Sequence, residues 1–298
     1  MDKKAVGTVN DGLTKVYDRA GISYFVYKYR GHNMIPIPVV AENLGKLNSL
    51  TIRTDDVLIC SYPGTGSHWL FEMTNMILKE KSERISTIKE DHMLEISRPE
   101  MLDAIDSPRL LHTHLPPDII PEGLLKDHKI LYLTRNPKAA FVSYFRHMAA
   151  LDEYGYRGTL ENYLEKLMNG EVIGGQFFEY THEIWRLIKD NPNAIVITYE
   201  EMKKVPFEVV SRIAKLLGKS ISNQLAENII DMCSFEKMTS EKSTESSNFT
   251  KELFRDNGSF YHNGQIATWK KWLTVEQSER IDACIQSQLI DQGINLNF

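Results

Sequence analysis

A short turn rich in glycine and hydroxyl side chains is the first candidate for chemistry in this sequence. Residues 63–67 read Pro-Gly-Thr-Gly-Ser and follow the apolar run 57–62. Such a turn between a strand and a helix offers backbone N–H groups, the hydroxyls of Thr65 and Ser67, and a helix N-terminus to a phosphate or sulfate. Gly66 permits close approach of the anion. The sequence also suits a purely structural turn, and it lacks the Gly-Lys-Ser/Thr ending of a P-loop ATPase.

Arg135 and Ser143 form a second candidate anion site. Arg135 directly follows the apolar run 130–134, and Ser143 comes about two helical turns later. A bidentate guanidinium together with a hydroxyl suits a phosphate group. A single arginine at a strand end more often pairs with a surface carboxylate, so the assignment depends on the glycine-rich turn nearby.

Two histidines provide candidate acid-base chemistry. His112 and His114 stand two apart on a strand-like run, so their side chains point to the same side. A histidine can take the proton from an acceptor hydroxyl as its oxygen attacks an electrophile. Two such histidines also suit a metal site, but no matching third and fourth ligands are evident, and we predict none. A structural role is open for one of the pair.

These residues require strands that end at a common edge. Four short apolar runs alternate with amphipathic helical patterns: strands at 57–62, 109–113, 130–134 and 194–199, and helices after 67, at 177–188 and at 207–217. Parallel sheets bind ligands beyond the carboxyl ends of their strands, where all three motifs fall. The sequence predicts an α/β fold, a single domain over residues 1–298, with a central parallel β-sheet flanked by helices and a P-loop-like strand-loop-helix.

Composition excludes several classes of function. The net charge of -5 argues against binding of a nucleic acid polymer by broad phosphate neutralisation. Three cysteines with no paired spacing suit a reducing compartment, and we see neither a secretion signal nor an apolar run of about 20 residues that would span a membrane. We therefore expect a cytoplasmic protein without a membrane partner.

Residues 236–263 are polar with little periodicity, and we expect a long mobile surface segment there.

Four stretches of the chain resemble the cytosolic, PAPS-dependent sulfotransferase family (sulfotransferase 1 domain type). That family typically shows YPKSGTTW, KTHLP, RNPKD and RKGxxGDWKxxFT in this order. The corresponding stretches here are YPGTGSHW at 62–69, HTHLPPDIIP at 112–121, LTRNPKAAFVSYFRH at 133–147 and FYHNGQIATWKKWLT at 260–274. The resemblance implies transfer of a sulfuryl group from 3′-phosphoadenosine 5′-phosphosulfate (PAPS) to a hydroxyl of a small organic acceptor, with PAP as the nucleotide product.

The resemblance also assigns roles to individual residues. It implies that His114 is the catalytic base, that Thr65, Gly66, Ser67 and His68 line the phosphosulfate end of PAPS, that Trp69, Tyr199 and Phe235 hold the adenine, and that Arg135 and Ser143 hold the 3′-phosphate. Lys270, Thr274, Val275 and Glu279 reproduce the spacing of the family's KxxxTVxxxE segment, which implies a homodimer. An ordinary exposed helix start also accounts for that spacing.

The departures from the family remove positive charge from the donor site. The loop lysine is replaced by Gly64, the lysine before Thr-His by His112, and the late Arg-Lys pair by His262 and Asn263, with Gly264 retained. Cys233 also replaces a usual threonine near the adenine. Transfer of this kind relies on stabilising charge that develops on the leaving phosphate. We hypothesise that His112 or His68, protonated beside an anion, partly replaces the loop lysine.

Two other functions fit parts of the sequence. The lost basic residues favour a weak or inactive protein that binds a nucleotide or a small ligand on the same fold. A P-loop kinase fits less well, because the loop lacks Gly-Lys-Ser/Thr and no Mg²⁺ motif is evident. Segments 25–29, 93–96, 145–148 and 172–178 are candidate apolar walls for the acceptor, although each is also typical of a core.

Overall fold

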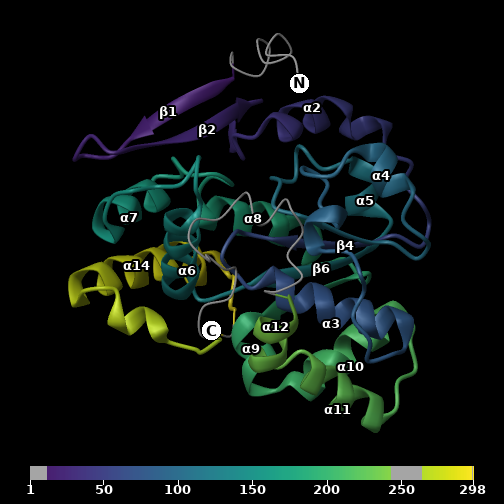
Figure 1. The fold of residues 1–298 in the computed structure, drawn as a ribbon. Coiled ribbons are helices and arrows are strands. Elements are labelled where there is room, and N and C mark those ends of the chain that lie inside the picture. The colour runs from purple at the N-terminus through teal and green to yellow at the C-terminus, as the bar shows by residue number, and fades with distance from the viewer. Residues whose placement is uncertain (1–11, 243–263, 297) are drawn as a thin grey trace.

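A four-stranded parallel sheet forms the centre of the molecule (Figure 1). The computed structural model describes residues 12–242, 264–296 and 298. The strands are β4 (Val57–Ser61), β5 (Leu110–Thr113), β6 (Lys129–Thr134) and β7 (Ala194–Thr198), in the order β5-β4-β6-β7. In the register, Val57 lies opposite Leu110 on one side and Lys129 on the other. All four predicted strands are confirmed to within about two residues.

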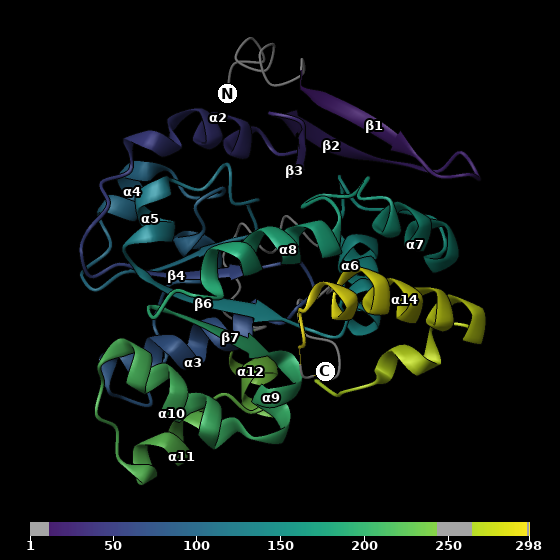
Figure 2. The ribbon, with the colours of Figure 1, turned by 180° about the vertical axis from the view of Figure 1, so that it is seen from behind.

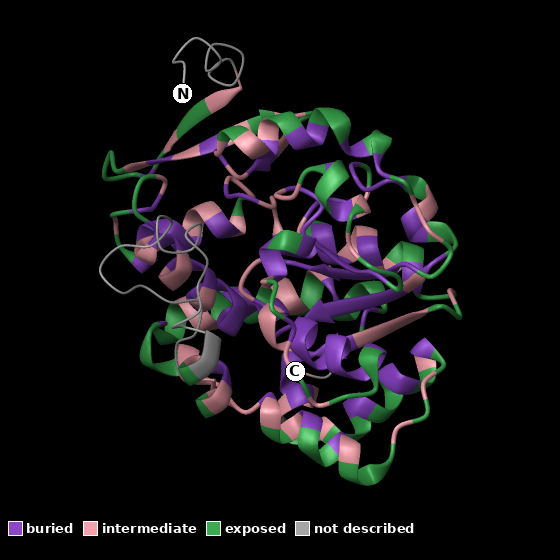
Figure 3. Ribbon diagram, turned by 45° about the vertical axis from the view of Figure 1, so that its right-hand side comes forward, coloured by how far each residue is buried: buried purple, intermediate pink, exposed green. Residues whose placement is uncertain are grey.

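Strands β4, β5 and β6 are buried on both faces almost throughout, and β7 is buried at its carboxyl end, which explains why their sequences read as continuous apolar runs. Leu58 and Cys60 pack into one core, and the alternate residues Val57 and Ile59 pack into a second core on the opposite face. Figure 3 shows most of the sheet as buried, inside a more exposed shell of helices, while residues 194–196 of β7 are intermediate. The predicted α/β fold with a parallel sheet between helices is confirmed.

Helices cover the two faces in separate groups (Figures 1 and 2). On one face lie α3 (Ser67–Lys79), α9 (Tyr199–Lys204), α10 (Pro206–Leu217), α11 (Asn223–Met232) and α12 (Phe235–Lys242). Toward the other face lie α6 (Pro137–Ala150), α7 (Leu160–Met168), α8 (Phe177–Ile188) and α14 (Val275–Gln288). The predicted helices at 177–188 and 207–217 are confirmed, and α10 ends at Gly218 with φ of 67°.

A small antiparallel sheet near the N-terminus was not predicted. It contains β1 (Leu13–Tyr17), β2 (Ser23–Tyr29) and β3 (His32–Met34), and it lies beyond α8, on the side of the central sheet away from α3 (Figure 2). The short helices α2 (Pro38–Lys46), α4 (Pro99–Asp103) and α5 (Glu122–Lys126) and the 3₁₀ turns η2 (Leu47–Ser49) and η3 (Lys89–His92) complete the first half. Two more 3₁₀ turns, η4 (Thr268–Lys271) and η5 (Ile290–Gln292), flank α14.

The expectation of an irregular segment over residues 236–263 is wrong at its start. Helix α12 begins at Phe235 and continues to Lys242. Met238 is buried, and the Ser234 hydroxyl accepts a hydrogen bond from the backbone N–H of Lys237 at 3.4 Å. The buried Met238 and the bond at Ser234 thus help to hold a helix whose composition is otherwise polar. The rest of the segment, 243–263, lies outside the described residues.

Candidate functional site

Two adjoining cavities open at the carboxyl ends of the central strands. The larger, of about 470 Å³, lies between α3, α6, α9 and α12, and the smaller, of about 190 Å³, lies beside the end of β5. Gly66, His68 and Ser143 line both. The connection after β4 leads to β5 and the connection after β6 leads to β7, so these two connections leave in opposite directions and open a crevice between β4 and β6. The fold therefore places the junction of the two cavities at the switch point of the sheet.

The glycine-rich turn forms the wall between the cavities. Gly64 and Gly66 have φ of 84° and 99°, in the left-handed region that glycine tolerates. A Cβ at Gly66 would lie 2.7 Å from the Tyr199 ring. Within the described ranges no side chain caps the N-terminus of α3 at Gly66, so this helix end is available to an anion. The Thr65 hydroxyl donates to the Tyr62 carbonyl at 2.7 Å, and Thr65 lines neither cavity.

Arg135 is the main positive charge of the large cavity. Its guanidinium lies 3.9 Å from the centre of the Tyr199 ring, and Nη1 donates to the Gly64 carbonyl at 3.1 Å. Burial lowers the pKa of the Arg135 guanidinium below its ordinary value. Its Nε and the Nε1 of Trp69 are buried without hydrogen-bond partners among the described residues. Buried donors in this state fit an acceptor that enters the cavity.

Most residues that the sequence assigned to the nucleotide gather around this large cavity. They are Gly66, His68, Trp69, Arg135, Ser143, Tyr199, Phe235 and Gly264, together with Cys233. The rings of Trp69 and Tyr199 meet edge to face at 5.5 Å. A Cβ at Gly264 would lie 2.4 Å from the Phe235 ring, so the chain passes close to that ring only as glycine. His262 and Asn263 lie outside the described residues.

Two cations of the large cavity were missed by the sequence analysis. Arg146 lies 5.3 Å from the centre of the Trp272 ring, and Lys203 lies 5.1 Å from that of Trp69. Arg146 follows Ser143 by three residues on α6, a spacing that brings both side chains to one helix face. That spacing was a signal available in the sequence.

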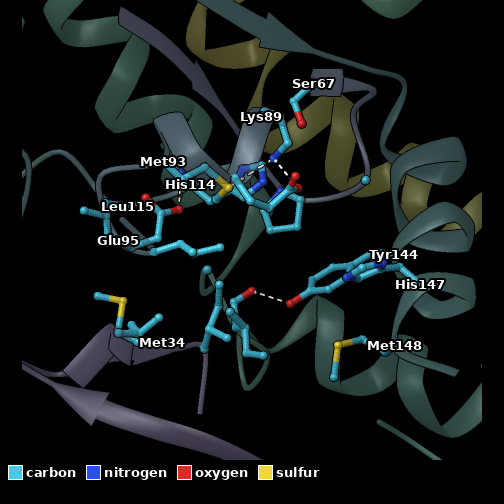
Figure 4. Close-up of a pocket in the computed structure, with 18 of the residues that line it drawn as sticks. Met34, Ser67, Lys89, Met93, Glu95, His114, Leu115, Tyr144, His147 and Met148 are labelled. Atoms are coloured by element: carbon cyan, nitrogen blue, oxygen red, sulfur yellow. Dashed lines mark hydrogen bonds and ion pairs between the residues drawn. The ribbon is translucent and has the colours of Figure 1, made fainter. Parts of the chain in front are cut away.

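His114 faces the small cavity in a defined protonation state (Figure 4). Its Nδ1 lies 2.6 Å from the Ser61 carbonyl oxygen, which can only accept, so Nδ1 carries the proton. Burial and then the positive charge of Lys89 lower the pKa of His114 to about 3. The ring is therefore neutral at pH 7, with a lone pair on Nε2 that can accept a proton.

Glu95 fixes the backbone around this histidine. Its Oε1 accepts a hydrogen bond from the His114 backbone N–H at 2.8 Å, and its Oε2 accepts one from the Thr113 hydroxyl at 2.9 Å. Burial raises the pKa of Glu95 against these hydrogen bonds. Glu95 also lines the small cavity and was not identified from the sequence.

His112 lies behind His114, with the two ring centres 4.6 Å apart. Its Nε2 lies 3.0 Å from the Ser61 hydroxyl. The side chain is fully buried and lines neither cavity, and burial holds its pKa well below the ordinary value. His112 is thus a neutral neighbour of His114 in this structure.

His68 and Lys89 share one carboxylate at the junction of the cavities. His68 Nε2 lies 2.9 Å from Glu90 Oε1, and Lys89 Nζ lies 3.5 Å from the same oxygen. Burial lowers the pKa of His68 and of Lys89, and Glu90 opposes both shifts. Lys89 was not identified from the sequence, because a lysine in a polar stretch carries no signal of burial.

The rest of the small cavity is mostly apolar, with the polar side chain of His147 among its lining residues. Its walls are Met34, Ile35, Ile37, Val40, Met93, Ile96, Leu115, Tyr144, Met148, Leu151 and Ile173. Of the four predicted wall segments, 93–96, 145–148 and 172–178 each contribute residues. Segment 25–29 does not, because β2 holds it in the N-terminal sheet and the chain reaches the cavity only at Met34. Among the described residues, no three His, Cys, Asp or Glu side chains come together to hold a metal ion.

Comparisons with known proteins connect this geometry to a reaction. Residues 54–293 match the sulfotransferase domain family. The chain is 30% identical to human sulfotransferase 1C2 over 273 residues, covering 88% of this chain and 91% of that protein. It is 32% identical to rat sulfotransferase 1A1 over 270 residues, covering 86% and 92%.

Solved structures show the same fold. The mouse sulfotransferase SULT7A1 complexed with PAP superposes with a TM-score of 0.72 and 25% identity, over 89% of this chain and 94% of that one. Retinol dehydratase in complex with androsterone and the inactive cofactor PAP superposes with a TM-score of 0.76, over 100% and 96%, at 18% identity. The second likeness concerns the fold alone.

Proposed function

Since this chain belongs to the sulfotransferase family and catalyses sulfuryl transfer, we propose that its large cavity binds PAPS and its small cavity binds the hydroxyl acceptor. The observation that carries the proposal is the junction of the two cavities at Gly66, His68 and Ser143. A donor and an acceptor that entered from opposite sides would meet there, beside His114. Reactants held in this way react as if in one molecule.

The large cavity suits a nucleotide with phosphates at both ends. Trp69, Tyr199 and Phe235 would contact the adenine, as aromatic faces do with bases. Arg135 and Ser143 would hold the 3′-phosphate. The Nε of Arg135 is buried without a hydrogen-bond partner among the described residues, so it is available to donate to that phosphate. We assign Arg146 to the same phosphate, in place of the Arg-Lys pair that His262 and Asn263 replace.

The glycine-rich turn would hold the sulfuryl end of the donor. The uncapped first turn of α3 directs N–H groups and a positive dipole end toward the junction, where Ser67 and His68 also lie. Gly66 has no side chain to obstruct this approach.

The small cavity suits an apolar alcohol or phenol. When the acceptor hydroxyl lies against His114 Nε2, the histidine takes the hydroxyl proton while the oxygen forms a bond to sulfur. The bond between sulfur and the 5′-phosphate oxygen breaks, and PAP leaves with that oxygen. The pKa of about 3 in the free protein is too low for an efficient base, but negative charge brought in by the donor raises the pKa of a nearby histidine. PAPS would therefore activate His114 as it binds.

The test is sulfuryl transfer from PAPS to a panel of phenols and alcohols by the wild type and by His114→Ala. We expect His114→Ala to lose 10²–10⁴-fold in kcat, the usual contribution of a general base, while its affinity for PAP changes less than about threefold. His32→Ala is the matched control, because His32 pairs with Asp118 at 2.9 Å and lines neither cavity. Full activity of His114→Ala would exclude this base.

We also propose a homodimer and a cytoplasmic location. Val275 is 74% exposed at the start of α14, and Thr274 caps that helix, so the segment with Lys270 and Glu279 presents an apolar side chain at the surface. Sedimentation velocity should show a dimer for the wild type and a monomer for Val275→Glu. A monomeric wild type would refute the proposed dimer.

The proposed cytoplasmic location rests on the cysteines. All three are unpaired, as is typical of a reducing compartment. No helix in the described ranges is long and apolar enough to cross a membrane.

A further inference from the structure

The site has a deficit of positive charge where the donor is most negative. Position 64, a lysine in the resembling family, is glycine here, and the structure leaves no room for a side chain there. Gly64 has φ of 84°, and a Cβ would lie 2.7 Å from the Ala140 carbonyl oxygen in the backbone of α6. A lysine could not return to this position without a shift of the helix.

The two histidines considered as substitutes are poorly placed to supply a charge. His112 is fully buried, lines neither cavity and is held neutral by burial. His68 lines both cavities, but burial lowers its pKa and its Nε2 already contacts Glu90 at 2.9 Å. A cation from elsewhere in the fold is needed.

Lys89 occupies the required place. Its side chain is only 4% exposed and lines the small cavity together with Gly66, Ser67, His68 and His114. Figure 4 shows Lys89, Ser67 and His114 at one end of this cavity, with Met34 and Met148 toward the other. Lys89 therefore lies at the end of the cavity that carries Ser67 and His114, with its ammonium also beside Met93 of the apolar wall.

The backbone holds Lys89 firmly at that end. The 3₁₀ turn Lys89–His92 is followed by Met93, which forms a parallel bridge with His112, and the Leu94 N–H donates to the His112 carbonyl at 3.0 Å. His92 Nδ1 lies 3.0 Å from the Leu110 carbonyl on the same strand. The segment that carries Lys89 is thus attached to β5, the strand that His114 directly follows.

The ammonium of Lys89 has more hydrogen-bond donors than close acceptors among the described residues. An ammonium has three N–H donors, and its contacts within hydrogen-bond or ion-pair distance are one oxygen of Glu90 at 3.5 Å and the thioether of Met93 at 3.1 Å, while the buried Glu95 carboxyl acts on it electrostatically. Glu90 is shared with His68, and a thioether is a weak acceptor. A buried cation with so few partners is stabilised by an anion that enters the cavity beside it.

We infer that Lys89 is the cation that contacts the phosphosulfate end of PAPS and stabilises the charge that develops on the leaving 5′-phosphate. Lys89 would then replace the family's loop lysine, which does not fit at position 64, in stabilising negative charge on the donor. It would do so from a different segment of the chain. This inference rests on the function proposed above.

The test compares ligands that differ only at the 5′ end. Wild type, Lys89→Met and Lys89→Arg are titrated by calorimetry with PAP and with adenosine 3′-monophosphate, which lacks the 5′-phosphate, and kcat is measured with PAPS. For Lys89→Met we expect kcat to fall about 100-fold, as when one charge-stabilising donor is lost, with PAP binding weakened about tenfold and adenosine 3′-monophosphate binding unchanged. Lys89→Arg should recover much of the PAP affinity.

Lys166→Met is the matched control, since Lys166 is largely buried, pairs with Glu171 at 2.8 Å and lines neither cavity. Thermal unfolding monitors folding, and Lys89→Gln replaces Lys89→Met if the latter does not fold. Unchanged PAP affinity and kcat in these variants, or an equal loss of affinity for both nucleotides, would overturn the role of Lys89. A wild type that neither binds PAP nor transfers sulfuryl groups would instead overturn the proposed function and this inference with it.

Discussion

His114 combines a fixed orientation with an unusual ionisation. The Nδ1–H of His114 donates a hydrogen bond to the Ser61 carbonyl. Burial and the positive charge of Lys89 lower the pKa of His114 to about 3. The ring is then neutral over the whole physiological range until an anion arrives. On the proposed function, the pKa of His114 would therefore rise when the donor binds. In the free protein, the same low pKa makes the free energy of unfolding depend on pH.

We predict that the free protein loses stability as pH falls from about 6.5 toward about 3. The pKa of His114 is lower in the folded state than the ordinary 6.5, so in this window the unfolded chain binds the additional proton. One such group accounts for as much as about 1.4 kcal/mol of unfolding free energy per pH unit, with full stability above pH 6.5. Urea unfolding of wild type and His114→Gln between pH 4 and 7 measures this difference. Parallel pH profiles for the two proteins would show that His114 does not have this pKa.

Gly66 offers a second test at a single residue. Gly66→Ala brings a Cβ to 2.7 Å from the Tyr199 ring, so that ring must leave its contact with Arg135. We expect PAP affinity to fall at least tenfold. Gly31→Ala is the control, because Gly31 has φ of 85° but no atom within 4 Å of the added Cβ. Both variants carry strain of about 1–3 kcal/mol, and only Gly66→Ala should lose PAP affinity. Equal affinities would show that the turn does not contact the nucleotide.

At the scale of elements, helix α6 links the two cavities. It begins after Arg135, and its Ser143 lines both cavities while Arg146 lines the large one. The helix that follows β6 therefore supplies several of the groups assigned to the 3′-phosphate.

From this arrangement we predict that Arg146→Ala weakens PAP binding about tenfold and leaves the affinity for adenosine 5′-monophosphate unchanged. The expected loss corresponds to about 1.4 kcal/mol, within the range for a charged hydrogen bond. Arg186→Ala on α8 is the control, since Arg186 is exposed and lines neither cavity. If Arg146→Ala weakens both nucleotides alike, Arg146 does not act on the 3′-phosphate.

The sequence predicted best those elements whose formation depends on one dominant effect, the burial of apolar side chains. The runs 57–62 and 130–134 are buried on both faces and could only be central strands. The strand ends then indicated where Arg135 and His114 must lie, and both line the cavities.

The elements that sequence missed depend on contacts distant along the chain. Strand β1 pairs with β2 through the backbone and has no buried side chain, so it shows no apolar pattern. Lys89 reaches the small cavity because its turn is hydrogen-bonded to β5, and nothing near it in sequence indicates that contact. Residues of this kind can be found only once the strands are assembled.

At the scale of the whole molecule, the two cavities are lined by different sets of elements that share α3 and α6. Helices α9 and α12 line only the large cavity, while Met34 of the N-terminal sheet lines only the small one. The N-terminal sheet and α12 lie on opposite sides of the central sheet (Figure 1). On the function proposed above, donor and acceptor would therefore enter from separate regions and meet at the strand ends. On that proposal, the small cavity of about 190 Å³, whose walls away from Lys89 and His114 are mostly apolar, favours a compact alcohol or phenol over a charged one.

The most direct measurement is a crystal structure with PAP and a simple phenol bound together. We predict PAP in the large cavity, with its 3′-phosphate on Arg135 and its 5′-phosphate at the glycine-rich turn. The phenol should lie in the small cavity with its hydroxyl within hydrogen-bond distance of His114 Nε2. A complex with PAP outside the large cavity, or with the phenol hydroxyl directed away from His114, would contradict this account.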